Sequence, residues 1–441
     1  MSSKHFVNDP DHLVTAALQS IALTNPAVGV DVQNKIVYLR PSQDDNTKQQ
    51  VRIISGGGSG HEPSFAAMVG HGLLAAAVAG TIFASPSTEQ IRTTIMARVD
   101  HARPDVGGEG GVLVTVMNYT GDVLNFGVAV EKARAAGVPI EMVIVGDDVG
   151  VGRAKAGKVG RRGIAGTVLV HKISGALAAQ GYSLTDVANV ARLVADNLVS
   201  VGASLEHVHV PGRDPKGPKH LQPGEVEIGM GIHNEAGSSQ EAIELPALVD
   251  KMLVQLLDKN DKDRAFLNIN SNEVVLLVNN LGGVSVLELG AIVTHVVTRL
   301  SEGYGIRPVR ILSGTYMTSL NGLGFSITLL NVVNTNLGGP SMIELLDFPA
   351  ETTGWTAPIG KHTWEAKNTA TREQQDPQQD APASSNLAYD AKVGIKMLAA
   401  GLEAVISVEP EVTRYDTVVG DGDCGIGLKR GAQGKPSSHV N

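Results

Sequence analysis

The chain has 441 residues, of which 42% are hydrophobic and 18% charged, an ordinary composition for a globular protein of two or three domains. A net charge of −9 gives no basic surface for nucleic acid or an anionic membrane. The single cysteine, Cys424, excludes an intrachain disulfide and cysteine-rich zinc sites. Neither a membrane-spanning apolar run nor an N-terminal signal segment is visible, so we expect a cytoplasmic protein.

The first 150 residues alternate between helix-like and strand-like segments. Apolar periodicity predicts helices over residues 11–24, 64–79, 88–100 and 125–136. Apolar runs predict strands over residues 35–40, 51–54, 111–117 and 139–145. Polar turns follow the later strands, and this alternation predicts a doubly wound parallel sheet whose ligands lie beyond the carboxyl ends of the strands. His61 and Asp122 would then lie at one edge.

The segment 51–63, VRIISGGGSGHEP, is the most distinctive stretch of the chain. Its apolar strand leads into four glycines within five residues, where the backbone can turn sharply and its N–H groups can form a nest for phosphate or hydroxyl oxygens. His61 would face whatever the glycines hold. The alternative is a glycine-rich turn that only packs tightly. The spacing does not match a P-loop.

The pattern predicts a second α/β lobe over about residues 195–350. Its expected strands are 274–278, 309–312 and 325–330, and its expected helices are 244–257 and 286–300. Within it, His233 lies in GIHNEAG, an open turn in which a histidine serves as nucleophile, base, ligand or plain loop residue. Before it, Arg161 and Arg162 in a glycine-rich turn indicate either an anion site or a solvated loop, and we favour the loop.

The composition changes towards the C-terminus. Residues 358–385 are rich in Gln, Asp, Pro and Thr, which predicts a disordered linker. An amphipathic helix is expected over 389–408. Asp416, Asp421 and Asp423 follow as D-x-x-x-x-D-x-D, and three carboxylates on a tight turn favour Mg²⁺ bridging nucleotide phosphates. A calcium-binding turn and a solvated acidic loop are the alternatives.

Taken together, these segments resemble the ATP-dependent, single-chain dihydroxyacetone kinases of fungi and other eukaryotes over residues 1–434. The resemblance rests on SGGGSGHEP (55–63), TIFASPS (81–87), NYTGD (118–122), GDD (146–148), GRRG (160–163), GTVLVHK (166–172), GMGIHNEAG (229–237), VNNLGG (278–283), GFSITLLN (324–331) and GDGDCG (420–425).

The resemblance implies a fold and a domain plan. Residues 1–357 would form an α/β substrate domain of the K type, in two lobes split near residue 195, with parallel and mixed sheets. Residues 358–385 would be the linker. Residues 386–441 would open an all-α nucleotide domain of the L type.

The resemblance also implies an activity, the phosphorylation of dihydroxyacetone, and of glyceraldehyde, by ATP in glycerol metabolism. His233 would add to the ketone carbon and form a hemiaminal, which glycerol cannot do because it has no carbonyl. Asp122 would be the general base, with His61 as its partner. The substrate hydroxyls would contact Gly57, Gly58, Ser59, Gly60 and His61.

For the nucleotide, the resemblance implies a Mg²⁺ site at Asp416, Asp421 and Asp423, and nucleotide contacts from Asp421, Gly422, Asp423 and Cys424. It also implies a homodimer.

Two departures from the family pattern stand out. Met117 occupies the position of a substrate-contacting lysine, and a thioether neither donates a hydrogen bond nor carries charge. The family's nucleotide domain has about 200 residues, whereas the chain ends at Asn441, so we expect residues 386–441 to be poorly folded and to bind ATP weakly. The alternative function is therefore a dihydroxyacetone-binding regulatory module without kinase activity. A subunit served by a separate phosphocarrier and a tubulin-like GTPase fit the motifs less well.

Overall fold

The structure is a computed structural model that describes residues 5–41, 50–100, 110–212, 221–269, 273–356, 359–366 and 390–434. The chain divides into two compact units, residues 1–368 and 369–441. The expected linker begins with a short helix, α10 (Lys361–Ala366), and residues 367–385 of it lie outside the described residues.

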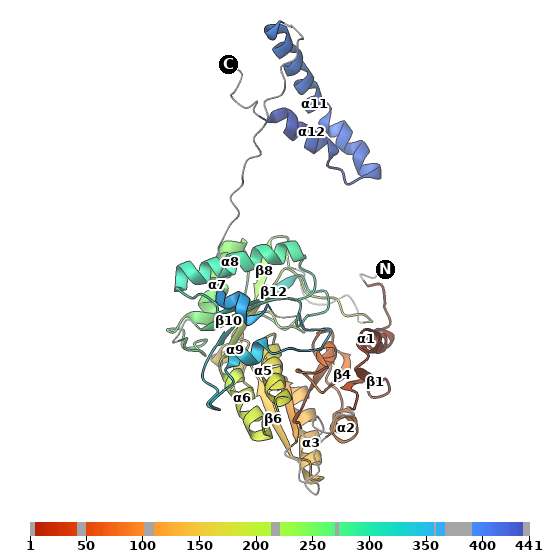
Figure 1. The fold of residues 1–441 in the computed structure, drawn as a ribbon, viewed down its shortest axis with the longest axis vertical. Coiled ribbons are helices and arrows are strands. Elements are labelled where there is room, and N and C mark those ends of the chain that lie inside the picture. Colours follow the sequence, from red (N-terminus) through yellow and green to blue (C-terminus); the bar gives the residue numbers. More distant parts are fainter. Residues whose placement is uncertain are drawn as a thin grey trace. The chain divides into compact units, whose positions relative to one another are not determined.

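Two six-stranded sheets make up the first unit in the described residues (Figure 1). The strands of the first sheet are β1 (Val28–Asp31), β2 (Ile36–Leu39), β3 (Arg52–Ser59), β4 (Ala76–Ile82), β5 (Val112–Met117) and β6 (Ile140–Val145). Those of the second are β7 (Leu198–Ser204), β8 (Glu225–Ile228), β9 (Ser239–Ala242), β10 (Val274–Asn280), β11 (Arg310–Gly314) and β12 (Gly324–Asn331).

Helices connect and cover these strands. In the first half they are α1 (Pro10–Thr24), a 3₁₀ turn η2 (Ala66–Met68), α2 (Thr88–Thr93) with the π-helical turn η3 (Thr94–Arg98), α3 (Thr120–Ala135), α4 (Arg153–Ala156), α5 (Thr167–Ala179) and α6 (Leu184–Asp196). Further along the first unit they are α7 (Leu245–Leu257), α8 (Val286–Tyr304) and α9 (Met342–Asp347).

The first sheet has the order β1-β2-β4-β3-β5-β6. β4, β3, β5 and β6 are parallel, and β1 and β2 add an antiparallel edge. Because β4 follows β3 on one side and β5 returns to its other side, the strand order reverses between β3 and β5. Ligands of such sheets bind at this switch point, beyond the carboxyl ends of the strands.

The second sheet has the order β11-β10-β12-β7-β8-β9 and is mixed. β10 and β11 are parallel, and the other neighbours are antiparallel. The α/β fold with parallel and mixed sheets that the sequence predicts is confirmed. β1, β7, β8 and β9 are additional strands that the sequence pattern did not predict.

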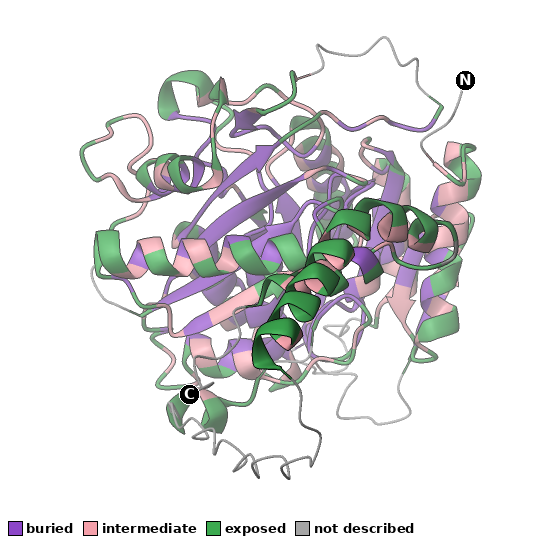
Figure 2. Ribbon diagram, turned by 90° about the horizontal axis from the view of Figure 1, so that it is seen from above, coloured by how far each residue is buried: buried purple, intermediate pink, exposed green. Residues whose placement is uncertain are grey.

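Three hydrophobic cores follow from this layering. The central core fills the space between the sheets, and α1, α5, α6 and α9 contribute side chains to it. A first outer core lies between the first sheet and α2 and α3, and a second lies between the second sheet and α7 and α8. Figure 2 shows the buried strands inside helices with exposed outer faces. Since both faces of each sheet are covered, the central strands are apolar on both sides.

β5 illustrates the sequence pattern of a strand that is buried on both faces of its sheet. Val112, Val114 and Val116 belong to the first outer core, whereas Leu113 and Met117 belong to the central core. Successive side chains of a strand point to opposite faces, so GVLVTVM needs no polar alternation.

The predicted helix over residues 64–79 is wrong. Only the short turn η2 is helical there, and β4 takes residues 76–82 between β2 and β3. The small apolar residues that suggested a buried helix suit a buried strand equally well, because a short apolar run does not distinguish the two.

The glycine-rich stretch also differs from the predicted turn, since β3 continues through it to Ser59. Gly56 pairs with Val78 and Gly57 with Ala79 on β4. A Cβ on Gly56 would lie 2.2 Å from the carbonyl oxygen of Val78, so this glycine allows close strand contact.

α5 is a helix that the sequence pattern did not predict. Twelve of its 13 residues are buried, so it has no polar face and no amphipathic period. Asp147 accepts hydrogen bonds from the N–H groups of Ile164 and Gly166 (2.7 and 2.8 Å), just before the helix begins. A carboxylate at this end is also favoured by the helix dipole.

The second unit contains a helical hairpin, α11 (Ala391–Val419) and α12 (Cys424–Gln433). α12 lies close against α11, because a Cβ on Gly425 would be 2.3 Å from Thr413 Oγ1. Large apolar side chains of the hairpin are nevertheless exposed, among them Val393 (53%), Ile395 (66%) and Met397 (71%). In the described part of the chain, no helix combines the length and apolar character that crossing a bilayer demands.

Candidate functional site

The candidate site lies at the carboxyl edge of the first sheet. His61 follows β3, and Tyr119 and Asp122 follow β5 at the start of α3. The loop between β8 and β9 of the second sheet brings His233 and Glu235 to the same place. The parallel strand order thus places the two sequence-predicted residues His61 and Asp122 at one edge, and the second lobe supplies the third, His233.

His61 is fully buried, and a residue of the second lobe forms a hydrogen bond with its ring. Its Nδ1 lies 2.8 Å from the carbonyl oxygen of Thr318. Since a carbonyl oxygen only accepts, Nδ1 carries the proton and Nε2 carries the lone pair in the neutral ring. Burial lowers the pKa of His61 to about 3, and the neighbouring His233 acts in the same direction.

His233 is oriented by Glu235. Its Nδ1 lies 2.9 Å from Glu235 Oε1, and its backbone N–H donates to Oε2 at 2.9 Å. Burial would raise the pKa of Glu235, but these hydrogen bonds and the electrostatic interaction with His233 hold it at about 2. Glu235 is therefore a carboxylate, the proton belongs to His233 Nδ1, and Nε2 carries the lone pair.

The two histidines meet edge to face, with Nε2 of His61 3.0 Å from Nε2 of His233. Both Nδ1 atoms already donate elsewhere, so two lone pairs would face each other unless a further proton lies between them. Because burial keeps His61 neutral, with a pKa of about 3, the Nε2 lone pair of His233 faces a buried, uncharged ring.

Asp122 supplies a buried acceptor beside this pair. Its side chain is 5% exposed, and its Oδ1 lacks a hydrogen-bond partner among the described residues. Burial raises the pKa of Asp122, and this effect outweighs a hydrogen bond with Ser85 and the electrostatic interaction with His233, which both lower it. A buried acceptor without a partner is costly. A substrate hydroxyl would satisfy it.

The glycine-rich end of β3 packs against residues 83–84. A Cβ on Gly58 would lie 2.7 Å from Ala84 N, and a Cβ on Gly60 would lie 2.7 Å from the ring of Phe83. That ring stacks on His61 at 5.3 Å. Close packing therefore accounts for Gly58 and Gly60. Gly57 lies beside the catalytic candidate Asp122, since its Cβ would be 3.7 Å from Asp122 Oδ2.

Met117 and Ser59, two other predicted contacts, are buried. Met117 is 1% exposed and belongs to the central core. A Cβ added to Gly163 would lie 2.8 Å from the Cβ of Met117, so the two residues pack closely. The Oγ of Ser59 donates to the carbonyl oxygen of Gly80 at 2.9 Å. Neither contact involves the histidine pair.

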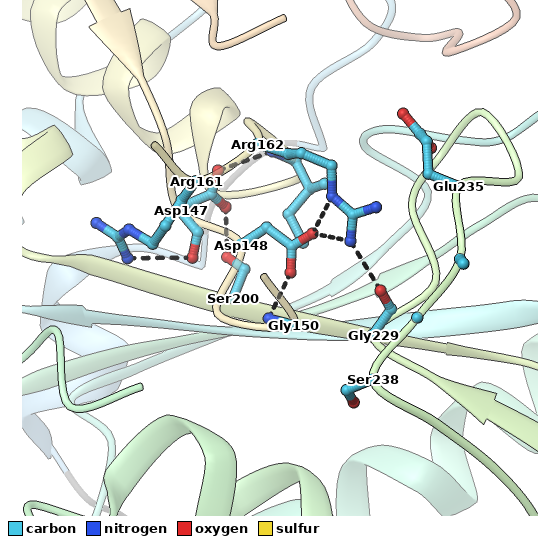
Figure 3. Close-up of polar contacts among 12 residues, drawn as sticks. Asp147, Asp148, Gly150, Arg161, Arg162, Ser200, Gly229, Glu235 and Ser238 are labelled. Carbon is cyan, nitrogen blue, oxygen red and sulfur yellow. Dashed lines mark hydrogen bonds and ion pairs between the residues drawn. The ribbon is translucent and has the colours of Figure 1, made fainter. Parts of the chain in front are cut away.

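The prediction that Arg161 and Arg162 lie in a solvated loop is wrong. The side chain of Arg162 is 13% exposed and forms an ion pair with Asp148, which is 1% exposed (Figure 3). The preceding GDD motif supplies buried carboxylates, and the positive charges of the two arginines neutralise them. Local sequence gave no sign of this pairing.

The acidic cluster lies in the second unit. Asp416, Asp421 and Asp423 offer oxygens within 4.8 Å of one another, and they are the one group of this kind found in the described residues. Asp416 Oδ2 accepts the N–H groups of Asp423 and Cys424 (2.9 and 3.0 Å). Repulsion from Asp421 raises the pKa of Asp423. Three mutually repelling carboxylates suit a hard divalent cation.

Sequence reasoning missed Glu235 and Thr318, which set the tautomers of the histidines, and Tyr119, whose ring packs against His233 at 4.6 Å. Glu235 stands in the quoted motif GMGIHNEAG, two residues after His233, so its spacing was a usable signal. Thr318 carried none.

The fold and the site together define a two-lobed α/β domain with a buried histidine pair at the carboxyl edge of its first sheet, accompanied by a helical unit with an acidic cluster. The Dak1 domain family matches residues 19–354. A dihydroxyacetone kinase of Pichia angusta is 44% identical over 447 residues, and the match covers 98% of this chain and 71% of the relative.

Solved structures agree. The dihydroxyacetone kinase of C. freundii in complex with AMP-PNP and Mg²⁺ has a TM-score of 0.72 and 34% identity, covering 98% of this chain and 74% of that one. The dihydroxyacetone kinase operon co-activator DhaQ has a TM-score of 0.64 and 30% identity, covering 76% of this chain and 96% of that one. The chain belongs to the dihydroxyacetone kinase family.

Proposed function

We propose that this protein is an ATP-dependent dihydroxyacetone kinase that tethers its substrate to His233. The observation that carries the proposal is the geometry of His233, whose Nδ1 is fixed by Glu235 while Nε2 faces a second histidine. The matches to dihydroxyacetone kinases over 98% of the chain support it.

The first step is addition of His233 Nε2 to the ketone carbon. The nitrogen lone pair forms the C–N bond, and the π electrons of the carbonyl move to its oxygen. The negatively charged oxygen then takes up a proton from water and becomes a hydroxyl. The substituted ring of His233 is cationic, and the carboxylate of Glu235 balances its charge.

The second step is removal of a proton from the substrate hydroxyl that attacks the γ-phosphate. Asp122 is the base, because its buried Oδ1 has no other partner and its pKa is raised by burial. The family resemblance implies that His61 assists Asp122 in this step.

ATP would be held by the second unit. Asp416, Asp421 and Asp423 would bind Mg²⁺, with Gly422 and Cys424 beside the nucleotide. A cation held there would supply positive charge to offset the charge of the phosphates during transfer. The elevated pKa of Asp423 fits a cluster that gains from a cation.

Purified protein incubated with dihydroxyacetone and Mg²⁺-ATP should form dihydroxyacetone phosphate, and His233→Ala should abolish this at low substrate concentration. Glyceraldehyde should be a second substrate and glycerol should not. If the protein forms no product and binds no dihydroxyacetone, the proposal fails.

A non-catalytic binding module is the second candidate, favoured by the likeness to the co-activator DhaQ. That likeness covers 76% of the chain, whereas the match to the kinase of C. freundii covers 98%. The kinase is therefore preferred. Dihydroxyacetone binding that depends on His233, without turnover, would support the module.

The family resemblance also leads us to propose a homodimer that acts in the cytoplasm. Light scattering of the purified protein would test the first point, and imaging of a tagged chain the second.

A further inference from the structure

The GRRG motif has no part in the proposed reaction, yet it reaches the loop that carries His233. We propose that Arg162, paired with Asp148, is a positioning residue: it holds the 229–237 loop and the carboxylate of Glu235 so that His233 keeps Nε2 free for attack. The effect on dihydroxyacetone binding rests on the proposed function, whereas the positioning of His233 by Arg162 rests on the contacts described below.

The first observation is the Arg162–Asp148 pair. Arg162 Nε donates to Asp148 Oδ2 at 2.8 Å, and Nη2 lies 2.6 Å from the same oxygen (Figure 3). Asp148 Oδ1 accepts the N–H of Gly150 at 2.8 Å. The carboxylate is thereby fixed from both sides, and it fixes the guanidinium in turn.

The second observation is the reach of Arg162 into the loop. Nη2 also donates to the carbonyl oxygen of Gly229 at 2.8 Å. Gly229 has φ +75° and lies against Gly150. A Cβ added to Gly150 would lie 2.7 Å from the Cα of Gly229. The arginine thus ties the segment after β6 to the first residue of the loop.

The third observation concerns Glu235. A Cβ on Gly231 would lie 2.1 Å from Glu235 Oε2 and 2.6 Å from Arg162 Nη1. The carboxylate and the guanidinium therefore converge on the same side of Gly231, where only a hydrogen fits. The positive charge of Arg162 faces the carboxylate that sets the tautomer of His233.

Tyr119 completes the connection. Its ring packs against His233, and its buried hydroxyl has no hydrogen-bond partner among the described residues. The hydroxyl interacts electrostatically with Glu235, Arg162 and Asp148. Besides these groups, His61 and Asp122 are the titratable groups that face His233. Arg162 is the cation among them.

A plain structural ion pair is the alternative reading. Such a pair would explain the neutralisation of Asp148, since a lone buried carboxylate is costly. It does not require that the remaining donors reach Gly229 and face Glu235. The two readings differ in what happens to His233 when the pair is replaced.

Arg161 provides a matched control. It belongs to the same turn, donates to the carbonyl oxygens of Asp147 (3.4 Å) and Leu198 (3.2 Å), and lies over the ring of Phe266. In Figure 3 its guanidinium lies on the opposite side of the two aspartates from Glu235.

The experiment compares the whole chain with Arg162→Lys, the charge-neutral double variant Arg162→Met/Asp148→Asn, Gly231→Ala and the control Arg161→Lys. Selective ¹⁵N-histidine labelling reports the tautomer of His233 in ligand-free protein, with its signals assigned by their loss in His233→Ala. Calorimetric titration measures the affinity for dihydroxyacetone, and thermal melting shows whether each variant folds.

We expect the Arg162 variants to lose the single Nδ1–H tautomer of His233 and to bind dihydroxyacetone about tenfold or more weakly, by analogy with the loss seen when outer partners of metal-ligating histidines are removed. Gly231→Ala should do the same without changing any charge. Arg161→Lys should match the parent protein in both measurements.

Unchanged tautomer and affinity in the folded Arg162 variants, or an equal change in Arg161→Lys, would overturn the inference. Should the double variant not fold, Arg162→Lys and Gly231→Ala still decide. If the parent protein does not bind dihydroxyacetone, the proposed function fails, while the tautomer of ligand-free His233 continues to test the role of Arg162.

Discussion

His61 and His233 lie 172 residues apart in the chain and 3.0 Å apart at Nε2. Each ring is fixed at Nδ1 by an acceptor, a carbonyl oxygen for His61 and a carboxylate for His233. At the scale of single residues, the chemistry of the site therefore depends on which nitrogen holds a proton. Thr318 and Glu235 are the acceptors that decide this.

Glu235→Gln tests the orientation of His233. Glutamine keeps the size of the side chain but removes the charge that fixes Nδ1–H, and hydrogen bonds to charged groups contribute about 1.5–3 kcal/mol. We expect dihydroxyacetone to bind at least about tenfold more weakly, as measured by calorimetry. Glu241→Gln, at a surface ion pair with Lys251, is the control and should have no effect. Equal affinity for the parent and Glu235→Gln would contradict the assignment.

Asp122→Asn separates capture from transfer. The amide cannot take the proton of the attacking hydroxyl, so phosphoryl transfer should fall by about 10²–10⁴-fold, the usual contribution of a general base. Covalent capture by His233 should persist, because Asp122 takes no part in it. Product formation and substrate binding are measured on the same preparation. A loss of binding that parallels the loss of turnover would assign Asp122 to capture instead.

At the scale of elements, α5 shows how burial replaces periodicity. It lies inside the central core with Lys172 fully buried, and Lys172 Nζ donates to the carbonyl oxygen of Leu345 in α9 at 2.9 Å. Burial lowers the pKa of Lys172 to about 7, and Asp347 opposes the shift. The helix therefore contains an amine whose charge is costly in the folded state.

This amine should make stability depend on pH. Between pH 7 and the ordinary lysine pKa of 10.5, the unfolded chain binds a proton at Lys172 that the folded protein has released, so the group favours folding as the pH rises. Below pH 7 the penalty is complete. Lys172→Met should therefore gain stability relative to the parent at pH 6.5 and lose that advantage by pH 10.

The measurement is denaturant unfolding at several pH values, with Lys132→Met, an exposed residue of α3, as the control. One pKa unit corresponds to about 1.4 kcal/mol, so the difference between parent and variant should change by a few kcal/mol across this range. A difference that does not vary with pH would show that Lys172 titrates alike in both states.

At the scale of the whole molecule, the two units differ in how they bury apolar surface. The first has three cores, whereas exposed side chains such as Val393, Ile395 and Met397 mark the hairpin of the second. Surface of this kind stabilises little, because the gain from burial is roughly proportional to the area removed from water. The expected weakness of residues 386–441 stays a prediction.

Hydrogen exchange tests it. Amides of α11 and α12 should exchange faster than those of α5 and α6, because few buried contacts hold the hairpin closed. Mg²⁺ should slow exchange around residues 416–424, since a cation that binds only the folded form stabilises it. Asp423→Asn should remove the response to Mg²⁺. Protection of α11 equal to that of α5 without any ion would contradict the prediction.

The sequence by itself determined what depends on local order. Strands such as β5 and β6, helices such as α7 and α8, and the three aspartates within eight residues were visible because periodicity and short spacing act within one segment. The edge shared by His61 and Asp122 followed from the alternation of strands and helices.

Only the tertiary structure decided what depends on neighbours from elsewhere in the chain. Residues 76–82 became β4 because two strands flank them, and α5 formed without an amphipathic period because it is covered on all sides. Arg162 was drawn from an expected loop to Asp148, and the His61–His233 contact needed both lobes. Burial and contacts between residues far apart in the sequence outweigh local propensity. Such contacts cannot be predicted from the sequence of one segment alone.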